Sequence, residues 1–164
     1  YFRAQMTLAR DLSLPVIVHN REAHGDTLDV VREFPDVIGV FHSYSGSAET
    51  AAELIKRGWY ISFSGTLTFK NAQRVRDVAK SLPADRILIE TDCPYLAPHP
   101  HRGELNHSGL LVYTAEALAN LHGLSLEEIC VITAKNAVRL FRLEIPQLTK
   151  DNRIKTEGDG PKAI

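Results

Sequence analysis

Three side chains that can bind a metal ion each follow a short apolar run in this sequence. They are His19 after residues 16–18, His42 after residues 37–41 and Asp92 after residues 86–90. Two imidazoles and a carboxylate suit Zn²⁺ or Mn²⁺, and Mg²⁺ less well. If the fold brings the three run ends together, the sequence predicts a divalent metal site. The alternative is that they are ordinary polar residues of loops.

Asp92 has the clearest need for a partner, because its carboxylate leaves a strand with the apolar core Ile87-Leu88-Ile89. A metal ion would compensate that carboxylate, which could also accept a proton from metal-bound water as a general base. We expect Glu90 to point to the other face of the sheet, by strand alternation, and to form a buried or helix-facing ion pair.

Apolar periodicity predicts a chain in which helices and strands alternate. Strands are predicted at 16–18, 37–41, 59–64 and 86–90, and helices at 2–13, 22–33, 48–57, 69–82, 108–122, 125–133 and 134–142. Ser47 is a predicted N-cap, and Ser125 with Glu128 three residues on predicts a capping box. Short buried strands separated by helices indicate a parallel sheet with helical crossovers. An open doubly wound sheet is the alternative, but it usually carries a glycine-rich loop after its first strand, which is missing here.

We therefore expect an α/β fold of the (β/α)8 TIM-barrel type, in which the carboxyl ends of all strands open onto one face and carry the active site. Four βα units are half of such a barrel, which typically needs about 250 residues. The chain opens at Tyr1 without an initiator methionine, so we expect it to be the C-terminal half. Residues 1–143 would form these units, and the polar residues 144–164 a poorly ordered tail.

Composition excludes several classes of protein. The 164 residues carry a net charge of −1 and are 44% hydrophobic, typical of a globular domain. No apolar run is long enough for a membrane span, so no membrane partner is expected. Binding of nucleic acid by bulk positive charge is excluded, so a polyanion would need a local site. Two cysteines are too few for a disulfide framework, which favours the cytoplasm.

Taken together, the motifs resemble the C-terminal part of the TatD family of metal-dependent deoxyribonucleases, over about residues 1–142. The motifs are LPVIVHNREA at 14–23, FHSYSG at 41–46, IETDCPYLAP at 89–98, PHRG at 100–103 and NAVRLF at 136–141. The resemblance implies a metal-dependent hydrolase of the amidohydrolase barrel type that cleaves phosphodiester bonds in DNA, often from the 3′ end. DNA, as single strands or 3′ ends, would be the substrate.

The resemblance also implies two divalent ions, Mg²⁺, Mn²⁺ or Zn²⁺. His19 and His42 would hold one ion and Asp92 the other, with Asp92 also orienting or deprotonating the attacking water. The family's first-strand His-x-His and its bridging Glu fall upstream of the region that matches Tyr1, so a full site would need the missing N-terminal half of the barrel. The family's Asn-Glu-Pro reads Asn106-His107-Ser108 here.

Four residues are candidates for substrate binding. His101 and Arg102 lie in a loop that would rim the site, where an arginine can fork onto a phosphate. Arg21 follows His19 closely and would contact phosphate or brace Asp92, and Ser45 precedes a helix start that could receive a phosphate. For Arg102, a solvated surface position is an equal alternative.

Two other functions fit the same residues. One is another hydrolase of the same barrel class, acting on a C–N bond or an aminoacyl ester. The other is a truncated, non-catalytic relative, which the missing ligands favour for the isolated chain. Screening substrates in the presence of metal would distinguish another hydrolase from a nuclease. An absence of turnover would indicate the non-catalytic relative.

Overall fold

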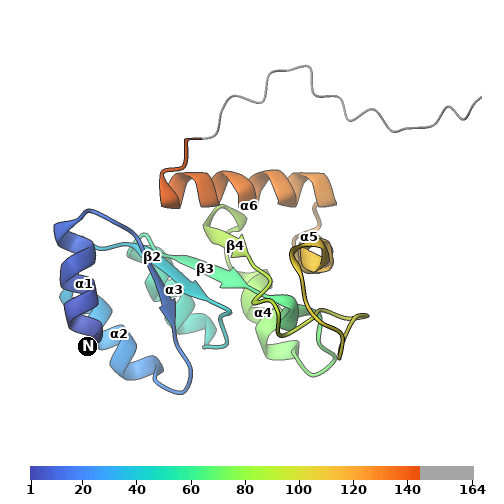
Figure 1. Cartoon of the computed structure of the whole chain (residues 1–164), viewed down its shortest axis with the longest axis horizontal. Helices are drawn as coiled ribbons and strands as arrows, with labels where there is room; N and C mark the ends of the chain where they lie inside the picture. The colour runs from blue at the N-terminus through green and yellow to red at the C-terminus, as the bar shows by residue number, and fades with distance from the viewer. Residues whose placement is uncertain (145–164) are drawn as a thin grey trace, which may run out of the picture.

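The computed structural model describes residues 1–144, and the tail predicted for residues 144–164 lies outside them except for Glu144. Its centre is a parallel sheet in the order β1-β2-β3-β4, shown in Figure 1. The strands are β1 (Val16–His19), β2 (Gly39–His42), β3 (Tyr60–Phe63) and β4 (Ile87–Ile89). The helices are α1 (Phe2–Asp11), α2 (His24–Glu33), α3 (Ala48–Lys56), α4 (Gln73–Ser81), α5 (Leu111–His122) and α6 (Leu126–Phe141). The predicted α/β fold with a parallel sheet is confirmed.

One face of the sheet carries the main hydrophobic core, which we call the outer face. Phe41, Ile61 and Ile87 on this face are at most 1% exposed and pack against apolar residues of α2, α3, α4 and α5. Trp59, just before β3, belongs to the same core and stacks edge-on against Phe41. Since parallel strands are covered by their crossover helices, this packing fixes which side chains of each strand remain for the opposite, inner face.

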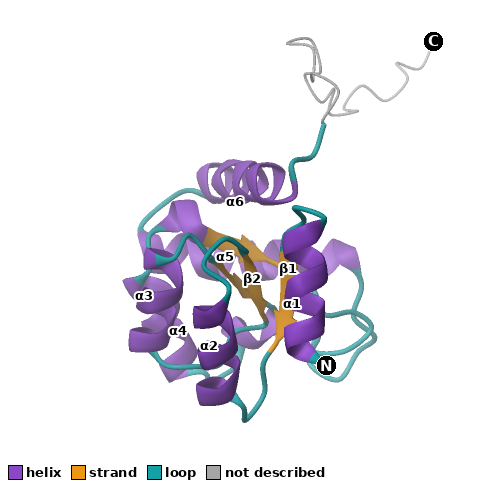
Figure 2. Cartoon of the chain, turned by 90° about the vertical axis from the view of Figure 1, so that its left-hand side faces the viewer, coloured by secondary structure: helices purple, strands orange, loops and turns teal. Residues whose placement is uncertain are grey.

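The inner face is closed at the amino ends of the strands by α6. Val40, Tyr60 and Leu88 form a second buried cluster with Leu140 of α6. Figures 1 and 2 show α6 crossing one end of the sheet. The amide of Asn136 supports this position by donating to the carbonyls of Ala84 and Ile87, at 2.8 Å each. The inner face is therefore filled at its amino end, while its carboxyl end is left for polar side chains.

Helix α6 corrects one prediction, because the two helices expected at 125–133 and 134–142 form one helix. The junction contains no proline or glycine that would break the helix, and the hydroxyl of Thr133 is satisfied within it by donating to the carbonyl of Ile129. Ser125 and Glu128 form the predicted capping box at its start. Two orphan backbone N–H groups are thereby satisfied.

We expect the substitution Ser125→Ala to lower the free energy of unfolding by about 1 kcal/mol, the usual cost of losing an N-cap. The hydroxyl accepts from the backbone N–H of Glu128 at 3.2 Å, and alanine offers no acceptor. Urea denaturation would measure the change, with Ser125→Asp as the matched control that keeps a capping oxygen. Equal stability of Ser125→Ala and wild type would contradict a contribution from the cap.

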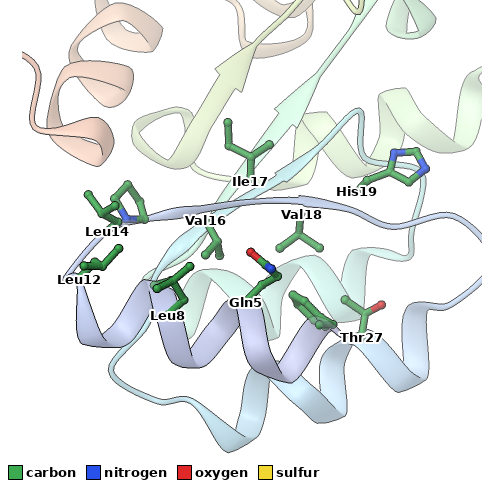
Figure 3. Close-up of a pocket in the computed structure, with 12 residues that line it drawn as sticks. Gln5, Leu8, Leu12, Leu14, Val16, Ile17, Val18, His19 and Thr27 are labelled. Atoms are coloured by element: carbon green, nitrogen blue, oxygen red, sulfur yellow. The ribbon is translucent and has the colours of Figure 1, made fainter.

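One of the two edges of the sheet is β1, which pairs only with β2 among residues 1–144. A groove of about 540 Å³ lies between this strand and α1. Figure 3 shows Val16 and Val18 pointing toward α1 while Ile17 points to the other face. Ile17 is 65% exposed, and Leu8, Leu12 and Leu14 are more than half exposed. An apolar strand edge of this kind normally packs against a further segment.

Within residues 1–144, the helices are all too short or too polar to cross a lipid bilayer.

Candidate metal centre

His19 and His42 meet because their strands are in register. They end β1 and β2 as direct partners of the parallel ladder. His19 Nδ1 lies 2.8 Å from His42 Nε2, and the two ring centroids are 5.1 Å apart. Adjacent lone pairs would repel, so this contact requires a proton on one nitrogen or a cation that both nitrogens bind.

Glu90 completes the arrangement and corrects the expectation that it faces away. Its Oε1 lies 2.9 Å from His42 Nδ1, and both side chains are about four-fifths buried, with exposed fractions of 22% and 21%. Alternation along β4 places Glu90 on the same face as Leu88, which packs on the inner face with Val40. Of the two expected forms of ion pair, buried or helix-facing, the structure shows a largely buried one, with the histidine that ends β2, two strands away in the sheet.

Asp92 reaches the same point from the turn after β4. One ligand atom from each of Asp92, His42 and Glu90 can be chosen so that all three lie within 4.8 Å of one another. The turn places Asp92 in the left-handed region with φ of 60°, a conformation that aspartate tolerates better than most residues. His19, His42, Glu90 and Asp92 are hereafter the carboxyl-end cluster.

Asn106 holds the turn that carries Asp92. It is 3% exposed, and its amide nitrogen donates to the carbonyls of Thr91 and Tyr95, at 2.6 Å each. These bonds close the chain on either side of Asp92, so Asn106 is a positioning residue for the carboxylate. From the sequence, this position stands out only as the start of the segment that departs from the family's Asn-Glu-Pro.

The donor set of the carboxyl-end cluster fits a divalent ion. If His42 donates its Nδ1–H to Glu90, its Nε2 presents a lone pair toward His19. This carboxylate–histidine pairing is typical of histidines that bind metals. The loop after β1 and the first residue of α2 add further unsatisfied groups. Both amide atoms of Asn20 and the Nδ1 of His24 are buried without a hydrogen-bond partner among the described residues.

The four residues predicted to bind substrate lie on loops at the carboxyl ends of the strands. Arg21 and Ser45 are exposed on the turns after β1 and β2. His101 uses both ring nitrogens within the protein, one with Glu104 at 2.9 Å and one with the hydroxyl of Tyr113 at 3.0 Å. Within residues 1–144, no hydrogen bond joins any of the four predicted residues to the carboxyl-end cluster.

Arg102, the fourth of these residues, is exposed and rests on an aromatic ring. Its guanidinium carbon lies 3.6 Å from the centroid of Phe69. The side chain is therefore held by a neighbouring loop, although it is open to solvent.

The turn after His42 is stabilised by hydrogen bonds of Tyr44 and Ser47. Tyr44 donates its hydroxyl to the carbonyl of Ser47 at 2.8 Å, and burial raises the pKa of this phenol to about 12. Ser47 caps α3 by accepting from the backbone N–H of Thr50, as predicted for this residue. A phenol with this pKa keeps its proton near pH 7, so Tyr44 remains a donor to Ser47. This hydrogen bond orients the chain that follows His42.

The parallel sheet and the residues at its carboxyl ends define an α/β protein with a candidate metal centre. The chain belongs to the family described as TatD related DNase, whose sequence profile matches residues 1–142. The predicted family is thereby confirmed.

Curated relatives carry names that describe metal-dependent hydrolases. The uncharacterized metal-dependent hydrolase YabD of Bacillus subtilis is 47% identical over 144 residues, which are 87% of this chain and 56% of YabD. The uncharacterized metal-dependent hydrolase YcfH of Escherichia coli K12 is 45% identical over 149 residues, 90% of this chain and 56% of YcfH. The chain thus spans about half the length of these relatives.

Solved structures show the same fold. YJJV, a TatD homologue from Escherichia coli K12, matches with a TM-score of 0.78 and 30% identity, over 85% of this chain and 54% of that one. A TatD family hydrolase from Entamoeba histolytica matches with a TM-score of 0.74 and 21% identity, over 85% of this chain and 55% of that one. The second likeness concerns the fold alone.

Proposed function

We propose that the polypeptide carrying this chain is a metal-dependent hydrolase that cleaves phosphodiester bonds in DNA, as a 3′-to-5′ exonuclease. The observation that carries this proposal is the carboxyl-end cluster, in which two histidines and two carboxylates from three strand ends converge. The family description supports DNA as the substrate. Two divalent ions, Mg²⁺, Mn²⁺ or Zn²⁺, would be bound.

In this proposal each residue of the cluster has a distinct task. His19 and His42 hold one ion and Asp92 holds the second. Glu90 accepts the Nδ1–H of His42 and so fixes the ring with Nε2 directed toward His19. When bound, the ions supply charge neutralisation for the attacking and leaving oxygens. The carboxylate of Asp92 orients the attacking water and accepts its proton.

The substrate residues would act at the rim of this site. Arg102 offers the planar donors that fork onto a phosphate oxygen, and Arg21 and Ser45 lie on the turns beside His19 and His42. His101 has both nitrogens bonded to neighbouring side chains. Direct contact of a ring nitrogen of His101 with DNA would therefore require one of these bonds to break.

A further part of the barrel is needed to complete the site. Four side chains supply too few ligands for two ions, which commonly take four or more ligands each. The exposed edge of β1 and the groove beside α1 offer a place for additional strands, with His19 at the end of the groove. We propose that the N-terminal half of the barrel covers this edge and brings the remaining ligands.

Two alternative functions can be tested against the proposed nuclease activity. A hydrolase acting on C–N bonds or aminoacyl esters would use the same cluster, because its chemistry also needs a metal-bound water. A non-catalytic relative would keep the fold but bind metal weakly. The cytoplasm remains our proposed compartment, supported by the unpaired cysteines Cys93 and Cys130.

The test uses a 5′-labelled single-stranded oligonucleotide and a C–N or ester substrate in parallel, each with Mn²⁺ or with EDTA. The polypeptide is assayed with and without its N-terminal half. A ladder shortening from the 3′ end, seen only with Mn²⁺ and the complete barrel, supports the proposal. Turnover of the C–N or ester substrate alone favours the first alternative, and no turnover by the complete barrel favours the second.

A further inference from the structure

A pocket with two cationic side chains, Lys70 and Arg102, lies between the loops that follow β3 and β4. It has a volume of about 360 Å³ and is lined by Phe69, Lys70, Asn71, His99 and Arg102. Both loops leave the carboxyl ends of their strands, the side of the sheet on which the carboxyl-end cluster lies. We infer that this pocket binds a phosphate of a nucleic-acid strand other than the phosphate being cleaved. This inference rests on the proposed function.

The arginine of this pocket is presented in a form suited to phosphate. Its guanidinium carbon sits 3.6 Å from the ring centroid of Phe69. An arginine held over an aromatic face keeps its N–H groups directed outward, where they can bind phosphate oxygens in pairs. Phe69 thus limits the movement of Arg102 without occupying its hydrogen-bond donors.

The two cations of the pocket have no acidic partner. Neither Lys70 nor Arg102 forms an ion pair or side-chain hydrogen bond within residues 1–144. Other arginines of the chain differ, since Arg3 and Arg32 each bond a carboxylate at 2.7 Å. Two exposed positive charges beside one pocket repel each other, and an anion between them removes that repulsion.

The loop after β3 is held in place by Arg76 of α4. This residue donates to the carbonyls of Phe69 at 2.6 Å and Lys70 at 3.3 Å, and also to that of Leu67. The three bonds fix the backbone on which Phe69 and Lys70 are carried. The lysine is therefore mounted on an ordered turn.

The loop after β4 is tied to the same turn. The backbone N–H of His99 donates to the hydroxyl of Thr68 at 2.7 Å. Gly65 lies so close to this loop that a Cβ there would collide with the carbonyl of Leu96. The loops after β3 and β4, which form the two walls of the pocket, are thus joined into one unit. A nucleic-acid strand bound there would be held at a fixed distance from the carboxyl-end cluster.

The test measures binding of a fluorescein-labelled single-stranded oligothymidylate to the full chain by anisotropy, in EDTA so that hydrolysis plays no part. We expect the double variant Lys70→Ala/Arg102→Ala to weaken binding at least 10-fold. The slope of log K against log salt should become shallower by about 0.7 for each phosphate that the variant no longer neutralises. Arg102→Lys should lie between wild type and the double variant, because it keeps the charge but lacks the paired donors.

The matched control is Lys80→Ala, an exposed lysine in the last turn of α4, at the opposite end of that helix from the pocket. It should bind like wild type. A strand with an uncharged methylphosphonate backbone should not distinguish wild type from the double variant. Equal affinity of the double variant and Lys80→Ala, or no measurable binding by wild type at low salt, would overturn the pocket's role. Neither result bears on hydrolysis, which the separate Mn²⁺ assay tests.

Discussion

The substitution Asp92→Asn is expected to lower kcat for DNA hydrolysis by about 10³-fold, within the range for loss of a general base. The amide keeps the size of the side chain and one metal-binding oxygen, but it cannot take a proton from water. The carboxylate lies within 4.8 Å of ligand atoms on His42 and Glu90, and the other carboxylate of the cluster, Glu90, is already hydrogen-bonded to His42. Single-turnover kinetics with Mn²⁺ and the complete barrel would measure the change.

Asp85→Asn is the matched control for this experiment. Asp85 is exposed and lies at the amino end of β4, while Asp92 follows the carboxyl end of the same strand. The control should retain wild-type kcat. Because Asp92 is partly exposed and has no ion pair within residues 1–144, both variants should keep the wild-type melting temperature. A kcat for Asp92→Asn within a few-fold of wild type would remove the carboxylate from the proposed mechanism.

The substitution Glu90→Gln should weaken divalent metal binding by about 10- to 100-fold, the usual effect of losing a carboxylate behind a metal-binding histidine. The glutamine oxygen can still accept from His42 Nδ1, but it lacks the negative charge that makes the ring a stronger ligand. Glu90→Ala should bind metal more weakly still, because the ring also loses its orientation. Calorimetric titration with Zn²⁺ measures this without any dependence on turnover.

Glu104→Gln provides the control for Glu90, since Glu104 bonds His101 Nδ1 at the same distance of 2.9 Å. That pair lies outside the carboxyl-end cluster, so its loss should leave the affinity for Zn²⁺ unchanged. If Glu90→Gln binds Zn²⁺ as tightly as Glu104→Gln does, Glu90 has no part in holding the metal.

Much of the fold could be predicted from the sequence because the signals are local. Apolar runs located the four strands, and the residue types at Ser47 and Ser125 located two helix starts. The prediction divides α6 into two helices. A continuous helix whose two ends pack against different partners has the same amphipathic pattern as two separate helices. Its two ends contact different parts of the sheet, with Ile129 in the outer core and Leu140 in the inner cluster.

The site was harder to predict because it depends on register. His19 and His42 could be placed at strand ends, but only the β1–β2 pairing brings their nitrogens to 2.8 Å. The prediction places Glu90 on the wrong face because alternation needs one residue of β4 whose face is known. That face is set by the contacts of β4 with α6 and β3. Counting from Leu88 would have placed it correctly.

The pocket beside Phe69 could not be predicted from local pattern at all. It forms where the chain near Lys70 meets the chain near Arg102, through the bond from His99 to Thr68. Contacts of this kind depend on how two loops pack, and no spacing in the sequence reports them. Asn106 was missed for the same reason, since its amide joins carbonyls on both sides of Asp92.

The central claim is that His19 and His42, supported by Glu90, bind one divalent ion at the carboxyl ends of the strands and that Asp92 binds a second. A crystal of the complete barrel soaked in Zn²⁺ and measured at the zinc absorption edge tests it most directly. The expected result is one anomalous peak at about 2.0–2.2 Å from ring nitrogens of His19 and His42, and a second at about the same distance from a carboxylate oxygen of Asp92. A map whose zinc peaks all lie more than about 5 Å from these side chains, well beyond any coordination distance, would contradict it.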